Sequence, residues 1–120
     1  MPKDISAENW ETEIEKSTKP VVAEFWQPSC IWCQRLSPVF DELAAESSQT
    51  EFVKVDIRAD EANMKRATEL GIQGTPTMKI FCEGRVVGEI VGFREKAALK
   101  EEIDGIVAKS KDCLEKSTAV

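Results

Sequence analysis

The sequence contains no histidine and no tyrosine among its 120 residues. Without histidine, neither a Ser-His-Asp nor a Cys-His catalytic group can form, and a Cys2His2 zinc site is excluded. Acid–base chemistry must therefore be carried out by carboxylates, lysines or cysteines. The chain also lacks internal repeats and low-complexity tracts. With 42% apolar residues it is long enough to build the core of one domain.

Basic residues and long apolar runs are also scarce. Sixteen lysines and arginines stand against 22 acidic residues, which gives a net charge of −6. This balance argues against nonspecific binding to nucleic acid or to anionic membranes, both of which need a basic face. No apolar run approaches the roughly 20 residues that span a bilayer, and residues 1–6 lack the features of a signal peptide. We therefore expect a cytoplasmic monomer with no nucleic-acid or membrane partner.

Only four cysteines are present, and of these only Cys30 and Cys33 form a local pattern. A structural disulfide framework is not expected, because such frameworks belong to small secreted domains with more cysteine and less core. A closed zinc site needs a second pair of ligands, so we expect no metal site. Cys82 lies in a predicted strand, where it should pack as a small apolar side chain. Cys113 lies in a polar tail, where we expect a tolerated free thiol.

Apolar periodicity predicts eight elements in the order α-β-α-β-α-β-β-α. They cover residues 6–16, 21–26, 30–46, 52–56, 60–70, 78–82, 86–91 and 95–109. The nearly continuous apolar run 21–26 suits a strand covered on both faces, and Pro38 is expected to kink the helix 30–46. A βαβ unit joined through a helix to a ββα unit predicts a mixed sheet between helices. We expect one domain over residues 1–109 and a polar tail over residues 110–120.

Several short segments, in order and at matching spacing, resemble the thioredoxin family from Ser6 to about Val107. They are Glu24-Phe25-Trp26, Cys30-x-x-Cys33, Pro38, Lys54-Val55-Asp56, the run Gly-Ile-Gln-Gly-Thr-Pro-Thr at 71–77, Gly84 and Gly92. The resemblance implies an α/β thioredoxin fold, with a mixed sheet of about four to five strands flanked by helices on both faces. It also implies a thiol-disulfide oxidoreductase, namely a cytosolic protein-disulfide reductase that needs no cofactor beyond its redox disulfide. Its implied partners are thioredoxin reductase as electron donor and disulfide-containing target proteins.

The Cys30–Cys33 pair has the chemistry that such an enzyme needs. Cys30 lies at the first turn of a predicted helix, where free backbone N–H groups and the helix dipole favour a thiolate. Its pKa should therefore fall below the free-thiol value of about 8.5. Cys33, one turn later, is within disulfide reach and can attack the mixed disulfide that Cys30 forms with a target. We interpret Cys30 as the nucleophile and Cys33 as the resolving thiol. The alternative is two unrelated core residues, or half of a metal site shared between chains.

Glu24 interrupts the apolar run of a predicted strand. A buried carboxylate without a partner costs several kcal/mol if it stays charged, so its pKa rises and it can exchange protons near neutral pH. The resemblance implies this role, since thioredoxins carry a buried acid, usually Asp, that helps to deprotonate the second cysteine. The alternative is a side chain that reaches solvent at the end of the sheet. Lys54, on the neighbouring strand, is the expected electrostatic partner, unless it is an exposed strand lysine.

A proline-containing segment completes the predicted site. The resemblance implies that the bond before Pro76 is cis and that Pro76 faces the disulfide. The Thr75 backbone would then offer an edge on which a substrate peptide pairs as an added strand. The alternative is an ordinary proline at the entry of a strand. We also assign Trp26 and Gly92 to the substrate-binding surface.

The residues between and before the cysteines depart from the family pattern. Ile31-Trp32 replaces the usual Gly-Pro, and Ser29 stands where tryptophan is usual. We assign Ile31 and Trp32 to substrate binding because they add apolar surface beside the nucleophile, although Trp32 can equally pack under a neighbouring loop. We also expect the Trp32 backbone N–H, which a proline would lack, to donate to a cysteine sulfur.

Two other functions stay open beside the reductase. One is a less reducing isomerase or oxidase, which the unusual Ile31-Trp32 pair favours and a cytosolic location disfavours. The other is an adaptor that binds partners without turnover. An adaptor would require neither the cysteine pair nor Glu24, so these residues count against it.

Overall fold

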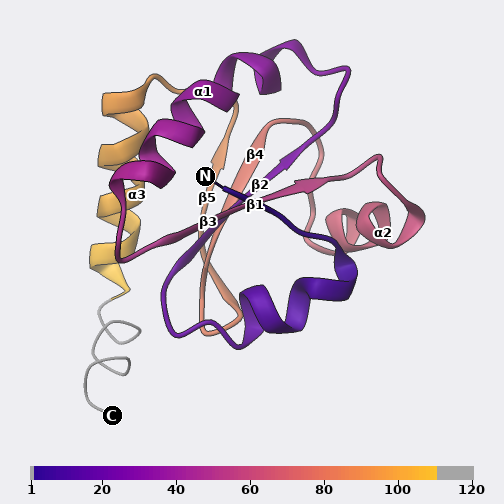
Figure 1. The fold of residues 1–120 in the computed structure, drawn as a ribbon, viewed down its shortest axis with the longest axis horizontal. Helices are drawn as coiled ribbons and strands as arrows, with labels where there is room; N and C mark the ends of the chain where they lie inside the picture. Colours follow the sequence, from indigo (N-terminus) through magenta and orange to yellow (C-terminus); the bar gives the residue numbers. More distant parts are fainter. Residues whose placement is uncertain (1, 111–120) are drawn as a thin grey trace.

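Residues 2–110 are described by a computed structural model, in which one five-stranded mixed sheet carries helices on both faces (Figure 1). In chain order the elements are β1 (Lys3–Asp4), η1 (Ala7–Asn9), η2 (Glu11–Glu15), β2 (Val21–Trp26), α1 (Ile31–Glu46), β3 (Glu51–Asp56), α2 (Glu61–Glu69), β4 (Thr77–Cys82), β5 (Arg85–Val91) and α3 (Lys96–Lys109). The strand order is β1-β3-β2-β4-β5. β1, β3 and β2 are parallel, whereas β4 is antiparallel to β2 and β5 to β4. The predicted α/β fold with a mixed sheet is confirmed.

Two features near the N-terminus differ from the prediction. The helix expected over residues 6–16 is a 3-10 turn, η1, followed by a π-helical segment, η2. Its inner side nevertheless buries Trp10 and Ile14, as the apolar spacing indicates. The sequence pattern does not predict β1, which adds a parallel edge strand beside β3. Two residues are too few to show a period, so an element of this length carries no periodic signal.

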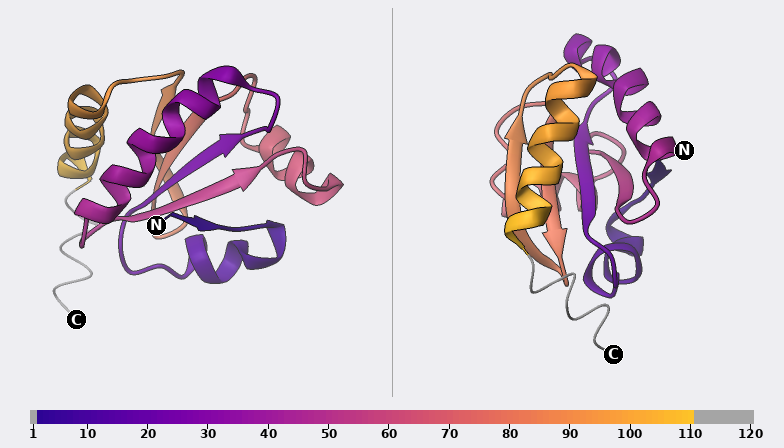
Figure 2. Two further views of the ribbon diagram at one scale, coloured as in Figure 1. Left: turned by 45° about the horizontal axis from the view of Figure 1, so that its top comes forward. Right: turned by 90° about the vertical axis from the view of Figure 1, so that its left-hand side faces the viewer.

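The core is divided by the sheet into two apolar layers. On one face, Trp10 and Ile14 pack with the strand residues Phe25, Val55 and Phe81. On the other face, α1 and α3 cover the sheet, with apolar residues from both helices in a single cluster. That cluster contains Leu36, Phe40, Leu43, Leu99 and Ile103 together with Val22, Phe52, Met78, Ile80 and Ile90. Figure 2 shows α1 and α3 side by side along this face. β2 is buried on both sides, as its continuous apolar run predicts.

Pro38 lies inside α1, whose helical conformation continues to Glu46; the kink stays a prediction. Among residues 2–110, none of the helices is long and apolar enough to cross a membrane.

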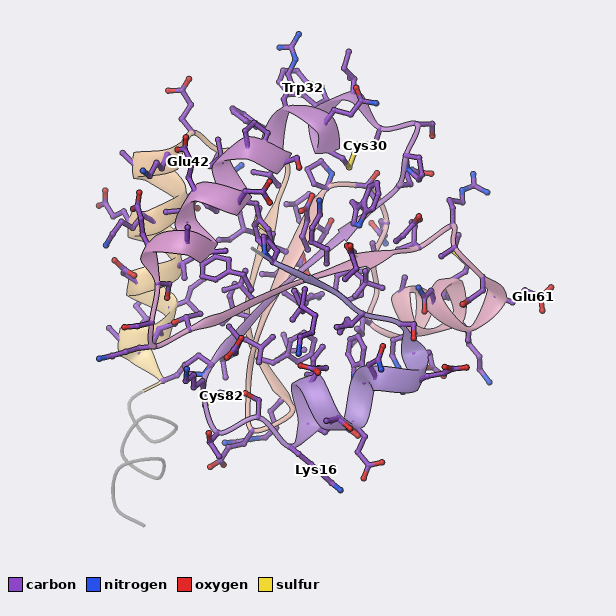
Figure 3. All side chains as sticks on the ribbon, viewed as in Figure 1. Lys16, Cys30, Trp32, Glu42, Glu61 and Cys82 are labelled. Atoms are coloured by element: carbon purple, nitrogen blue, oxygen red, sulfur yellow. A yellow bond between two sulfur atoms is a disulfide. The ribbon has the colours of Figure 1, made fainter. Side chains whose placement is uncertain are left out.

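The antiparallel pairing of β2 with β4 determines which loops meet. Phe25, near the end of β2, pairs with Thr77, at the start of β4. The turn that follows β2 and the segment that precedes β4 therefore lie at the same end of the sheet. This end carries Cys30 and the N-terminus of α1, whereas Cys82, at the end of β4, lies at the opposite end of the molecule (Figure 3).

Candidate functional site

A disulfide joins Cys30 and Cys33 at the start of α1, with their Cα atoms 5.2 Å apart. Cys30 is the N-cap residue of the helix, and its Sγ accepts a hydrogen bond from the backbone N–H of Cys33 at 3.1 Å. The two cysteines differ in access to solvent, because Cys30 is partly exposed whereas Cys33 is only 3% exposed. The helix therefore presents one sulfur of the pair to the surface and directs a backbone donor at it.

The segment before β4 contacts this disulfide from the other side. The Thr75–Pro76 peptide bond is cis, as the resemblance implies. The carbonyl oxygen of Thr75 lies 3.4 Å from the Sγ of Cys30. Pro76 itself is buried, and its carbonyl accepts a hydrogen bond from the Gly92 N–H at 2.8 Å. Gly92 has a φ of +92°, which side-chain-bearing residues rarely adopt, so glycine suits this position. The sheet thus brings Cys30, Thr75, Pro76 and Gly92 together.

Glu24 lies in the middle of β2 with none of its surface exposed. Neither of its carboxylate oxygens has a hydrogen-bond partner among the described residues. Burial raises the pKa of the Glu24 carboxyl to about 7; the positive charge of Lys54 opposes this rise, and the negative charge of Asp41 adds to it. The alternative in which Glu24 reaches solvent at the end of the sheet is therefore wrong. The site contains a carboxyl that can exchange its proton near neutral pH.

Lys54 is the register partner of Glu24 on the adjacent strand β3. Its Nζ lies 4.8 Å from the centroid of the Trp26 ring and 3.5 Å from the Oγ of Ser37. It donates no hydrogen bond to Glu24, so it acts on that carboxyl through space. Lys54 is partly buried and thus differs from the exposed strand lysine of the alternative. Trp26 is also partly buried, and its indole Nε1 has no hydrogen-bond partner within residues 2–110.

Ile31 and Trp32 form an exposed apolar surface beside the disulfide, with 59% and 49% of their surface accessible. The Trp32 ring also packs against Phe93, in the loop before α3, with ring centroids 5.8 Å apart. The guanidinium of Arg35 lies 4.8 Å from the Trp32 ring centroid. The expected packing of Trp32 on a neighbouring loop is therefore observed for one side of the ring, while the rest stays exposed, and its role in substrate binding stays a prediction. The backbone donor to the Cys30 sulfur is Cys33, not Trp32, so that expectation is wrong.

Two polar residues near the site were missed from the sequence. Gln27, in the turn after β2, donates from its Nε2 to the Oγ1 of Thr75 at 3.1 Å. Arg58, after β3, donates from its Nε to the Oε1 of Gln27 at 3.1 Å. The two hydrogen-bonded pairs, Arg58–Gln27 and Gln27–Thr75, are 31 and 48 positions apart in sequence, so no local pattern could connect them.

Cys82 lies away from this site, at the opposite end of the molecule (Figure 3). Cys82 is 1% exposed at the end of β4, in agreement with its predicted burial, but it is not a free thiol. The prediction for Cys113 falls outside the described residues. Within residues 2–110, no group of three or more metal-binding side chains comes together.

Comparisons with known proteins agree with this geometry. The family model described as Thioredoxin matches residues 2–105. A thioredoxin from Mycolicibacterium smegmatis is 36% identical over 100 residues, which cover 82% of this chain and 88% of that protein. Thioredoxin 1 from Synechococcus elongatus is 39% identical over 93 residues, or 77% of this chain and 84% of that protein. A bifunctional thioredoxin reductase/thioredoxin from Mycobacterium leprae is 34% identical over 96 residues, or 79% of this chain but only 20% of that protein.

The fold, the disulfide at the start of α1 and these relatives all point to the same family. They confirm the predicted family and the predicted enzyme class, a thioredoxin-type protein-disulfide reductase. The chain belongs to the thioredoxin family of thiol-disulfide oxidoreductases.

Proposed function

We propose that this chain reduces disulfides of target proteins in the cytosol, with Cys30 as nucleophile and Cys33 as resolving thiol. The difference in exposure between the two cysteine residues carries this assignment. Cys30 is partly exposed, whereas Cys33 is 97% covered, so an incoming target disulfide can reach only the first. A cytosolic location fits, because disulfides used for catalysis are the usual exception to the reduced state of cytosolic thiols.

In the first step, the Cys30 thiolate attacks one sulfur of the target disulfide. A bond forms between Cys30 and that sulfur, and the other target sulfur leaves as a thiolate and takes up a proton. The backbone N–H of Cys33, 3.1 Å from the Sγ of Cys30, stabilises the attacking thiolate together with the N-terminus of α1.

In the second step, Cys33 attacks the Sγ of Cys30 and expels the second target sulfur. The target is then a dithiol that has gained two electrons, and Cys30–Cys33 is oxidised. Cys33 must lose its proton to react, and we assign Glu24 to accept it. A carboxyl with a pKa of about 7 and no hydrogen-bond partner suits this transfer. Lys54 supports the ionised form of Glu24 by lowering its pKa.

We assign target binding to the surface around the disulfide. Ile31 and Trp32 provide exposed apolar contact area, and the Thr75 backbone lies against Cys30, where an extended peptide can pair with it. Gly92 and Pro76 support this edge through their mutual backbone hydrogen bond. Trp26 contributes from β2, where its ring contacts Lys54.

Two thiols carry both electrons, so no prosthetic group is needed for this cycle. The oxidised protein must then be reduced again. The relative from Mycobacterium leprae combines thioredoxin reductase and thioredoxin in its name, which supports a thioredoxin reductase as the electron donor here.

Residues 1–109 are proposed to form the catalytic domain, since α3 ends at Lys109 and the family match ends at residue 105. A chain that ends after residue 109 should therefore still reduce a target disulfide. Loss of that activity in the truncated chain would place an essential part beyond Lys109.

Cysteine variants test the assignment of roles. Cys30→Ser should abolish disulfide reduction, because no exposed nucleophile is left. Cys33→Ser should still attack targets but accumulate stable mixed disulfides, visible by mass spectrometry of the intact chain. If both variants trap targets equally, the assignment of nucleophile and resolving thiol fails.

An isomerase or oxidase is the second candidate, favoured by Ile31-Trp32 in place of Gly-Pro and by the N–H donor at the Cys30 sulfur. Stabilising the thiolate stabilises the dithiol form and makes the couple more oxidising. The equilibrium of Cys30–Cys33 with glutathione decides between the two. A couple as reducing as the roughly −270 mV of a thioredoxin supports the reductase, and one near −180 mV supports the isomerase.

A further inference from the structure

A chain of two hydrogen bonds connects an exposed arginine to the loop that contacts the disulfide. Arg58 donates to the Oε1 of Gln27, and the Nε2 of Gln27 donates to the Oγ1 of Thr75, both at 3.1 Å. Gln27 is partly buried in the turn between β2 and α1, so it lies between the two loops that it joins.

Arg58 determines the direction of both bonds. A guanidinium has only donors, so the oxygen of the Gln27 amide must face Arg58 and its NH2 group must face Thr75. The hydroxyl oxygen of Thr75 is therefore held as an acceptor. Without Arg58 the Gln27 side chain loses the contact that fixes its position, so its hydrogen bond to Thr75 is no longer held in place.

The main chain of the same threonine contacts the nucleophile. The Thr75 carbonyl oxygen lies 3.4 Å from the Sγ of Cys30. In the reduced protein this oxygen can accept a hydrogen bond from the neutral thiol, whereas it repels a thiolate. A carbonyl fixed at this place therefore favours the thiol form of Cys30.

We propose that Gln27, oriented by Arg58, is a positioning residue that holds the Thr75 carbonyl against Cys30 and so restrains formation of the thiolate. The inference rests on the proposed role of Cys30 as nucleophile. A contact that disfavours the Cys30 thiolate destabilises the reduced dithiol form relative to the disulfide. The couple therefore becomes more reducing. Gln27 thus offsets the N–H donor of Cys33 and biases the site towards reduction.

A direct effect of the Arg58 charge would act in the opposite direction. A nearby cation favours a thiolate, so removal of Arg58 would then make Cys30 less acidic. If Arg58 acts through Gln27, its removal frees the Thr75 carbonyl and makes Cys30 more acidic. The sign of the change separates the two explanations.

Other charged and titratable groups lie on the elements packed around the disulfide, and all must stay unchanged in the variants used. They are Cys33, Arg35 and Asp41 on α1, Glu24 on β2, Lys54 and Asp56 on β3, and Arg94 before α3.

The experiment measures alkylation of Cys30 by iodoacetamide in the reduced full chain as a function of pH, with the modified site identified by mass spectrometry. Arg58→Met, Gln27→Ala and Thr75→Val should each shift the midpoint of the profile down by about half a pH unit, a roughly threefold change in the proton-binding constant. The double variant Gln27→Ala/Thr75→Val should shift it no further than either single change, because both break the same chain. Gln34→Ala is the matched control. Its amide donates to the Pro28 carbonyl in the same region, has no bond to Thr75, and should leave the midpoint in place.

An upward shift in Arg58→Met would overturn the proposal in favour of a plain charge effect. Additive shifts in the double variant, or an equal shift in Gln34→Ala, would also overturn it. Alkylation needs no protein target, so these outcomes are independent of whether the chain reduces target disulfides. Failure of the proposed function would instead appear in the target-reduction assay with the wild-type chain.

Discussion

Replacement of Glu24 by glutamine removes one ionisable group from the centre of the sheet and leaves the side-chain volume nearly unchanged. Glu24 has no exposed surface, and its two oxygens lack hydrogen-bond partners in the described part of the chain. Burial is the main cause that raises its pKa from 4.5 to about 7. The folded protein therefore holds the Glu24 proton more tightly than the unfolded chain does.

This difference makes stability depend on pH in a defined window. Because the folded-state pKa is the higher one, the stabilising contribution of protonated Glu24 is fully present below about pH 4.5 and is lost as the pH rises to about 7. The loss amounts to about 3 kcal/mol, at 1.36 kcal/mol for each pH unit between the two pKa values. The free energy of unfolding should thus fall across this window and level off above it.

Urea unfolding of the oxidised wild type and of Glu24→Gln at a series of pH values measures this effect. The difference in unfolding free energy, wild type minus variant, should fall by about 3 kcal/mol between pH 4.5 and 8. The chain has no histidine, so the change near pH 7 has no imidazole contribution. A difference that stays constant with pH would refute the reasoning.

Glu42→Gln is the control for this experiment. Glu42 lies on α1, is exposed, and pairs with Lys96 at 3.6 Å on the surface. Loss of this surface pair should lower the free energy of unfolding by at most about 1 kcal/mol and produce no step near pH 7.

Glu24→Gln should in addition slow the release of target from the mixed disulfide more than its formation, because only release needs Cys33 deprotonated. An unchanged release rate would remove Glu24 from the proton transfer.

Other substitutions have outcomes that the same unfolding measurements check. Lys54→Met should raise the pKa of Glu24 further and move the pH-dependent fall in stability upwards, because Lys54 lowers that pKa; a downward move would contradict this. Gly88→Ala should destabilise by about 1–3 kcal/mol, since an added Cβ would lie 2.6 Å from the Cγ2 of Ile106. Gly105→Ala, in α3, should stabilise by about 1 kcal/mol, because nothing lies within 4 Å of an added Cβ there. If Gly88→Ala and Gly105→Ala changed the free energy of unfolding by the same amount, lack of space for a Cβ at position 88 would not be the cause.

Most of the fold could be predicted because its elements have strong local patterns. The continuous apolar run of β2 indicates burial on both faces, and the helical spacing of Leu36, Phe40 and Leu43 indicates the inner side of α1. The hairpin between β4 and β5 turns at Glu83 and Gly84, both with positive φ, which matches its two-residue length. β1 was missed, and the helix expected over residues 6–16 has an irregular geometry that was not predicted, because tertiary contacts, rather than a period, determine both.

The burial of Glu24 could not be predicted from the local sequence alone. An acidic residue in an apolar strand indicates either burial or a route to solvent, and the two possibilities differ only in what covers the strand. The covering comes from α1, which places its apolar side over this face of the sheet. Whether the carboxyl finds a partner also depends on the register with Lys54, which only the pairing of β2 with β3 determines.

The Cys30 sulfur combines a predictable contact with an unpredictable one. A backbone donor at this sulfur follows from its place at the start of a helix, although the donor is the N–H of Cys33, at 3.1 Å, and not the expected N–H of Trp32. The carbonyl of Thr75, at 3.4 Å, comes from 45 residues away through the pairing of β2 with β4. The donor favours the thiolate and the acceptor favours the thiol. The C-x-x-C motif therefore indicates that the site is redox-active, whereas its reduction potential depends on how firmly Gln27 and Arg58 hold the acceptor in place.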